Sequence, residues 1–213
     1  METNGLTILH ADPHIAVVEK PGGLLAVPGR GPDKQDCVAA RIRHHFPDSI
    51  AQPAVHRLDM ATSGLMVFGL TRAAHRHLSR QFEDRLVEKQ YLALVDGIVT
   101  GETGTIKLRF RLDPDNRPYQ VYDPVQGKLG ITSWCKIGIE GKLTRIEFTP
   151  LTGRTHQLRL HAAHEQGLHC PIVGDRLYGR GKEGDRMLLH ASFLRFIHPD
   201  TGETMSFASV PPF

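Results

Sequence analysis

The sequence predicts an α+β fold built around a largely antiparallel mixed sheet that is flanked by helices and loops. Candidate strands outnumber candidate helices, and several strands follow one another along the chain with only a turn between them. In a doubly wound α/β fold, strands and helices would instead alternate. The strand-rich order therefore favours the α+β class.

The first part of the chain contributes strands with strong apolar runs and helices with clear ends. Apolar stretches of four to eight residues bounded by turn residues are typical of buried strands, and helical spacing that stops before a proline marks the end of a helix. In chain order we expect a strand at 15–18 followed by a tight turn at 20–23, a helix at 36–46, a strand at 63–70, and a helix that Thr71 caps and that runs to about Arg85.

The second part of the chain is richer in strands, several of which alternate in polarity. Such alternation is typical of strands with one buried face. We expect strands at 90–95, 105–112, 131–137 and 145–149, a helix that starts after a turn at 152–155 and runs to about Gln166, and a last strand at 187–197.

Length and composition are those of an ordinary globular chain. The 213 residues fit a single domain over 1–213, with 40% hydrophobic and 23% charged residues. Three widely separated cysteines argue against a disulfide framework and favour a reducing compartment. The N-terminus has no signal-like pattern and no run approaches the ~20 apolar residues that span a bilayer. We therefore expect a cytoplasmic protein without a membrane partner.

The charge is distributed unevenly although its sum is small. The formal net charge of +3, from 26 Lys and Arg against 23 Asp and Glu, does not by itself indicate a polyanionic partner. Arginines are concentrated at 41–45, 72–85 and 154–159. A folded chain can build a basic face from such clusters.

Asp59 is the first candidate catalytic residue. It lies on polar connecting chain just before the apolar run at 63–70. A carboxylate held there can act as a nucleophile or base if a nearby guanidinium keeps it ionised. Taken alone, however, an Asp before a Thr-Ser-Gly turn is more often a structural capping residue. Local context leaves both interpretations open.

Other chemistries have weaker support. Ser63 lacks the glycine two positions earlier that a nucleophile elbow requires. His161 and His164 resemble metal ligands in type, but no zinc-binding pattern accompanies them, and a structural or RNA-facing role is favoured. The glycine-rich stretches do not continue into phosphate-binding motifs, so no nucleotide cofactor is expected.

Several ordered motifs, taken together, resemble those of one enzyme family. His56-Arg57-Leu58-Asp59-Met60-Ala61-Thr62-Ser63-Gly64 resembles the H-R-L-D-x-x-T-S-G signature of the RluA family of pseudouridine synthases. The remaining matches are the segment 15–29, Glu88-Lys89-Gln90-Tyr91, the Thr-Gly-Arg-Thr-His-Gln-Leu-Arg motif at 152–159, Gly174-Asp175-Arg176-Leu177-Tyr178-Gly179, and Leu188-Leu189-His190-Ala191.

The resemblance implies a pseudouridine-synthase-type catalytic domain, an isomerase that needs neither a cofactor nor a metal. It implies that Asp59 acts at the ribose, by attacking C1′ or by removing the 2′ proton, and the sequence does not choose between these routes. It further implies that Arg154 pairs with Asp59, and that Tyr91 stacks against the uracil and takes part in proton removal from C5. Arg57 and His56 would contact the flipped nucleotide, and Leu189 would line the pocket.

Within the family the chain is most similar to the short member that modifies both 23S rRNA and a tRNA anticodon stem-loop. Three features indicate this member, namely Met60-Ala61 within the signature, Asn116-Arg117-Pro118 after a strand, and the expected absence of an N-terminal S4 domain. The partners implied are those two RNAs, with no obligate protein partner. The main alternative is a non-catalytic RNA-binding or RNA-folding protein on the same scaffold, and a metal-dependent or serine hydrolase is a more distant one.

Overall fold

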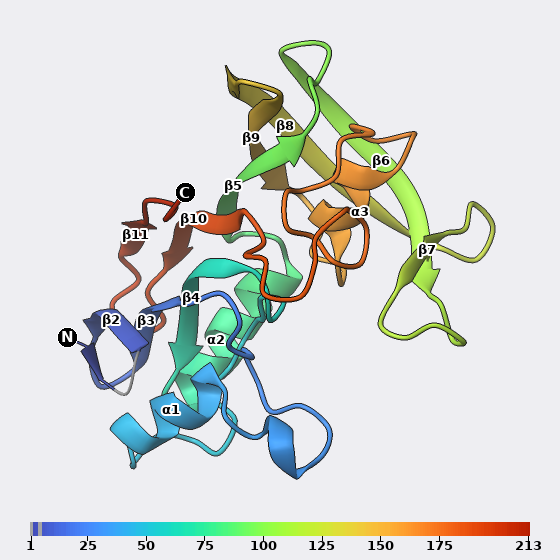
Figure 1. Ribbon diagram of the computed structural model, residues 1–213. Helices are drawn as coiled ribbons and strands as arrows, with labels where there is room; N and C mark the ends of the chain where they lie inside the picture. The colour runs from blue at the N-terminus through green and yellow to red at the C-terminus, as the bar shows by residue number, and fades with distance from the viewer. Residues whose placement is uncertain (1, 4–5) are drawn as a thin grey trace. The chain divides into compact units, whose positions relative to one another are not determined.

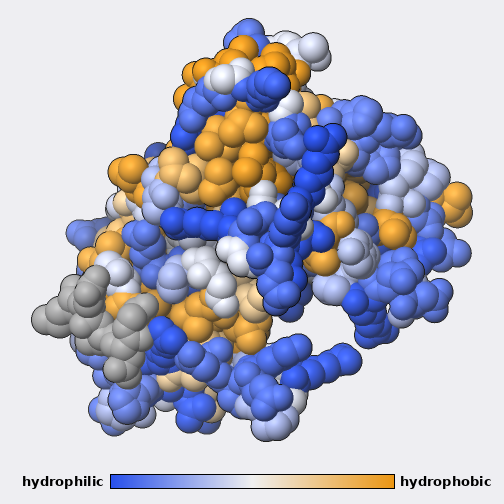
Figure 2. All heavy atoms as spheres, viewed as in Figure 1, coloured by the Kyte–Doolittle hydropathy of each residue, from blue (hydrophilic) through white to orange (hydrophobic). Residues whose placement is uncertain are grey.

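The computed structural model describes residues 2–3 and 6–213, which fold into two compact units (Figure 1). The first unit contains the described residues up to Lys89 together with His190–Pro212, and the second contains Gln90–Leu189 and Phe213. Charged and polar residues cover much of the face in Figure 2, with smaller hydrophobic patches between them. None of the described helices is both long and apolar enough to cross a membrane.

The first unit combines a mixed sheet with two α-helices. Its sheet order is β1-β2-β3-β4-β10, with β11 paired to β10; β4 and β10 are parallel, and every other pair is antiparallel. The elements are β1 (Glu2–Thr3), β2 (Leu6–Ala11), β3 (Ile15–Lys20), the 3-10 turn η1 (Pro32–Lys34), α1 (Val38–His45), β4 (Ser63–Gly69), α2 (Arg72–Glu83), β10 (Leu189–Ile197) and β11 (Thr204–Ala208).

The core of this unit lies between α2 and one face of the sheet. Ala74 and Leu78, on the inner face of α2, pack with side chains from β3, β4 and β10 such as Val17, Val67 and Phe196. Thr71 caps the helix by accepting a hydrogen bond from Ala74 N at 3.1 Å. Packing of this apolar face stabilises the helix more than its intrinsic propensity does.

Strand β4 is buried along its whole length, and it needs a glycine where it meets β10. Gly64 has φ +114°, and a Cβ there would lie 2.3 Å from the backbone oxygen of Ala191. The parallel register pairs these two residues directly. Only glycine allows this close approach of the two strands, immediately after the segment that contains Asp59.

The second unit is an antiparallel sheet with one short helix. Its strand order is β5-β9-β8-β6-β7, and its core contains Ile106, Leu108, Phe110 and Leu160, against which Trp134 packs. The elements are β5 (Glu88–Asp96), β6 (Thr103–Leu112), β7 (Gln120–Tyr122), β8 (Lys128–Glu140), β9 (Leu143–Pro150) and α3 (Gln157–Ala163).

The α+β class and the mostly antiparallel sheets confirm the prediction from the sequence, and each predicted strand and helix is present. Several boundaries differ, as in β8, which spans Lys128–Glu140 rather than 131–137. Helix α3 ends at Ala163 rather than near Gln166, because His164 takes an extended conformation and the chain folds back, with Leu168 N donating to His161 O at 3.0 Å. A Cβ at Gly167 would lie 1.9 Å from that same oxygen, so this reversal requires a glycine.

Candidate active site

Asp59 lies in the loop that enters β4, and its neighbours are fixed by hydrogen bonds on both sides. The backbone oxygen of Asp59 accepts a hydrogen bond from Thr62 N at 3.1 Å, which closes a tight turn. The oxygen of the next residue, Met60, accepts from Gly23 N at 2.8 Å. The side chain of Asp59 is half-buried. The turn between Lys20 and Gly23 thus holds the backbone of the Asp59 loop in place.

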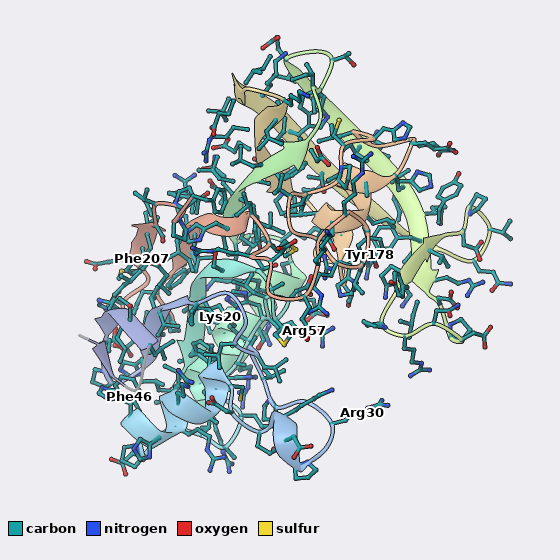
Figure 3. The ribbon with its side chains drawn as sticks, viewed as in Figure 1. Lys20, Arg30, Phe46, Arg57, Tyr178 and Phe207 are labelled. Atoms are coloured by element: carbon teal, nitrogen blue, oxygen red, sulfur yellow. The ribbon has the colours of Figure 1, made fainter. Side chains whose placement is uncertain are left out.

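Lys20 connects the same two segments from within the protein. Its side chain is completely buried, and its ammonium donates to the backbone oxygens of Pro21, Leu24 and Met60 at 2.8, 2.8 and 2.9 Å (Figure 3). Burial lowers the pKa of Lys20 to about 7, and the negative charge of Asp59 opposes that fall. Lys20 is therefore both a mechanical anchor of the loop and a positive charge coupled to Asp59.

The role of Lys20 was not inferred from the sequence, where residues 20–23 were interpreted as a turn within the family-like segment 15–29. A signal was present, since Lys20 ends a strand in which four consecutive residues, 15–18, are fully buried. A lysine in that position is hardly ever buried unless its charge is satisfied. Three carbonyl oxygens supply one acceptor for each N–H of the ammonium.

His56 is engaged by the protein itself. Its Nε2 accepts from Val67 N at 3.1 Å, and its ring stacks on Phe82 with centroids 4.4 Å apart. Burial, followed by the charge of Lys89, lowers the pKa of His56 to about 3, so the ring is neutral. These contacts give His56 a structural role beside Asp59, and its predicted contact with RNA stays a prediction. Arg57 is exposed at the surface of the same loop (Figure 3).

Ser63 is part of a buried hydrogen-bonded chain. Its Oγ lies 2.9 Å from His190 Nδ1, and His190 Nε2 lies 2.9 Å from Ser209 Oγ. Ser63 is 4% and His190 0% exposed. The chain therefore joins β4, β10 and the segment after β11 inside the core, and it gives no support to the hydrolase alternative.

Arg154 lies in a turn that hydrogen bonds of Gln157 connect to strand β8 of the second unit. Gln157 Oε1 accepts from Arg154 N at 3.1 Å and from the hydroxyl of Thr152 at 2.7 Å. Its Nε2 donates to Ile131 O at 3.0 Å and to the Thr132 hydroxyl at 2.9 Å. Gln157 is thus a positioning residue that the sequence motif contained without revealing its role. The side chain of Arg154 itself is exposed.

The motifs at 152–159 and 174–179 interlock. Arg159 donates two hydrogen bonds to the carboxylate of Asp175, both at 2.7 Å, and this ion pair is buried. Burial is the largest single effect on the pKa of Asp175 and raises it. The hydrogen bonds and charge of Arg159 nevertheless lower this pKa overall. The Tyr178 hydroxyl accepts from Gln120 N at 2.7 Å and lies 2.9 Å from His156 Nδ1. These contacts fix the chain that follows the Arg154 turn.

The other predicted site residues of the second unit occupy defined positions. Tyr91 is half-buried on β5, in register with Phe148 of β9. Leu189 is 3% exposed and is the first residue of β10. Asp59, Arg57 and His56 belong to one unit, and Tyr91, Arg154 and Leu189 to the other. The pairing of Asp59 with Arg154 therefore stays a prediction.

His161 does not resemble a metal ligand. It is fully buried, neither ring nitrogen has a hydrogen-bond partner, and its ring meets the edge of Phe110 with centroids 5.8 Å apart. Among residues 2–3 and 6–213, no group of three or more His, Cys, Asp or Glu side chains could hold a metal ion. Of the roles considered for His161, the structural one fits this environment.

Comparison with known proteins gives consistent matches over nearly the whole chain. The family model described as RNA pseudouridylate synthase matches residues 14–164. The chain is 42% identical to the dual-specificity RNA pseudouridine synthase RluA of Haemophilus influenzae and to that of Escherichia coli K12, in each case over 98% of this chain and 94% of the relative. The solved structure of human RNA pseudouridylate synthase domain containing 1 covers 100% of this chain, and 87% of that structure is matched, with 30% identity and a TM-score of 0.80.

Proposed function

Because the chain belongs to the RNA pseudouridylate synthase family, we propose that it converts uridine to pseudouridine in both 23S rRNA and a tRNA anticodon stem-loop. The observation that carries the proposal is the family match over residues 14–164, which includes Asp59, Tyr91 and Arg154. The two substrates are supported by relatives named as dual-specificity enzymes. Since the matched range contains residues of both units, we also propose that the two units act as one catalytic domain, in the cytoplasm.

The reaction exchanges one glycosidic bond for another. The bond from N1 of uracil to C1′ of the ribose breaks, the base turns, and C5 of the same base bonds to C1′. The proton on C5 leaves, and N1 takes up a proton. The product is an isomer of the substrate, so no redox partner or external group donor is required. The nucleotide must first leave the base stack, which costs a few kcal/mol and is easiest in a loop.

Asp59 acts at the ribose in this proposal. As a carboxylate it either attacks C1′ or removes the 2′ proton, and both routes require it to be ionised. Within the first unit Lys20 donates to Met60 O at 2.9 Å and so holds the Asp59 loop, and the charge of Asp59 raises the pKa of Lys20. Arg154 is proposed to add a second positive charge, held by Gln157.

Tyr91, Arg57 and Leu189 complete the proposed site. Tyr91 stacks against the uracil and takes part in proton removal from C5, Leu189 lines the base pocket, and the exposed Arg57 supports the flipped nucleotide. The hydrogen bond of His56 to Val67 N gives it a positioning role in addition to the contact with RNA predicted for it.

Mapping of pseudouridines in cellular RNA tests the substrates directly. Total RNA is compared from cells that lack the gene, cells that regain it, and cells that regain the Asp59→Asn form. We expect one site in 23S rRNA and one in a tRNA anticodon stem-loop to be lost, and to return only with the unaltered protein. The proposal would be overturned if no such site is lost in cells without the gene. It would also be overturned if the lost sites return with the Asp59→Asn form.

A further inference from the structure

Helix α2 carries a stripe of arginines on its exposed face. Arg72, Arg76 and Arg80 are spaced four residues apart, which places them on one side of a helix, and all three are exposed. Together with His75, Ser79, Glu83 and Ile50 they line a surface hollow of about 490 Å³. We call this feature, defined by Arg72, Arg76 and Arg80, the arginine stripe.

The protein does not neutralise the arginine stripe. Two other arginines of the same unit have carboxylate partners, Arg41 in Asp36 at 2.8 Å and Arg195 in Glu88. Among residues 2–3 and 6–213, none of the three stripe arginines forms an ion pair with a carboxylate. Glu83 is the single acidic residue lining the hollow. Three exposed guanidinium groups therefore share the hollow with one carboxylate, and none of them forms an ion pair with it.

The arginine stripe is unfavourable for the helix that carries it. Like charges four residues apart repel along a helix, and the stripe contains two such pairs. Arg72 is also the first residue of α2, at the positive end of the helix dipole, and the first turn contains no acidic residue. A helix selected for stability alone would carry acids there, so the arrangement points to an external anion.

The hollow borders the chain that leads into the Asp59 loop. Ile50 lines it, and His75, which also lines it, has Nε2 3.3 Å from Ala54 O. Ala54 bridges to Phe68 of β4 and precedes His56 by two residues. An anion bound along the stripe therefore lies beside the segment that supports the candidate catalytic loop, within the same unit.

We propose that the arginine stripe binds successive phosphates of the substrate RNA, outside the nucleotide that is modified. The inference rests on the proposed function, because it takes RNA as the partner. Guanidinium groups bind phosphate oxygens in a forked geometry, and three of them in a row match a chain of phosphodiesters better than a single small anion. Contacts of this kind position RNA without reading its sequence, so the stripe serves two different RNA substrates equally well.

The test is a triple variant, Arg72→Gln, Arg76→Gln and Arg80→Gln, in the full chain. The probe is a uridine-containing stem-loop RNA labelled with tritium at C5, and both its dissociation constant over a salt titration and its tritium release at saturating RNA are measured. We expect at least tenfold weaker binding at low salt and a slope of log affinity against log salt reduced by about 2–3, since each lost phosphate contact contributes about 0.7–0.9. The rate at saturating RNA should remain unchanged.

The matched control is Lys34→Gln, Lys142→Gln and Lys182→Gln, three cations on separate segments of the chain. Lys34 ends η1, and all three are exposed. This variant has the same net charge as the stripe variant, so it removes the same long-range attraction for RNA. The proposal is overturned if the two variants lose affinity equally, or if the stripe variant binds like the unaltered protein. If the unaltered protein releases no tritium, the proposed function fails instead, whatever the stripe does.

Discussion

Acidification should destabilise the second unit through His161, and replacing this residue should remove the effect. Burial is the main cause that lowers the pKa of His161 to about 4, and the charge of His164 adds to it. In the unfolded chain a histidine has a pKa of about 6.5. As the pH falls below about 6.5, the unfolded state therefore takes up a proton that the folded state resists until about pH 4, and the free energy of unfolding falls over this window.

The magnitude follows from the difference between the two pKa values. One unit corresponds to about 1.4 kcal/mol, so this single group costs about 2 kcal/mol of stability at pH 5 and about 3 kcal/mol below pH 4. The substitution His161→Leu should abolish this contribution. It should also stabilise the unit by about 1–3 kcal/mol at pH 7, because the two nitrogen atoms of His161 are buried without partners.

The assay is urea denaturation followed by the fluorescence of Trp134, the single tryptophan of the chain, which packs against the core beside Leu160. Unaltered protein and His161→Leu are compared at pH 7 and pH 5, with the exposed His44→Gln as the control. We expect the stability difference between His161→Leu and unaltered protein to widen by about 2 kcal/mol at pH 5. An equal difference at both pH values would refute the reasoning, as would an equal widening with the control.

Three further substitutions test the packing around the candidate site. Lys20→Met leaves three backbone oxygens without their donor, so we expect a loss of at least about 2 kcal/mol of stability by thermal denaturation. Tritium release at saturating RNA should also be slower. Unchanged release would mean that Lys20 does not support Asp59. Gly64→Ala places a Cβ 2.3 Å from Ala191 O and should lower the free energy of unfolding by more than about 3 kcal/mol in the same measurement. The control Gly138→Ala, whose Cβ meets nothing within 4 Å, should be nearly neutral. Equal losses in the two variants would contradict the close approach of the strands. Asp175→Asn removes the partner of a buried arginine and should cost about 3–5 kcal/mol in urea denaturation followed by Trp134, and a cost below about 1 kcal/mol would contradict the importance of the ion pair.

The elements that the sequence predicted best are those with strong local signals. The run Ser63–Gly69 is apolar throughout and is the fully buried strand β4, and Thr71 caps α2 as its position before the helix indicates. Strands β1, β2, β7 and β11 were not predicted. Strand β7 has only three residues, and most residues of β2 and β11 are partly or fully exposed. These strands therefore lack both a continuous apolar run and a long alternation of polar and apolar residues.

The motifs were visible in the sequence, but what holds them was not. The buried pair of Arg159 and Asp175 spans 16 residues, and the anchor from Lys20 to Met60 spans 40. Contacts between distant segments depend on the tertiary fold, which local spacing does not report. The same reason explains why His56, predicted to contact RNA, is seen to stack on Phe82 and to accept a hydrogen bond from Val67 N.

The central claim is that Asp59 performs the chemistry on uridine in RNA. The most direct measurement compares unaltered protein with Asp59→Asn on a stem-loop RNA labelled with tritium at C5, and records both tritium release and the RNA dissociation constant. Asparagine has nearly the same shape as aspartate but carries no negative charge. We predict release by the unaltered protein, none by Asp59→Asn, and RNA affinity within about threefold of the original, a small change in free energy. Release by Asp59→Asn at the unaltered rate would contradict the claim.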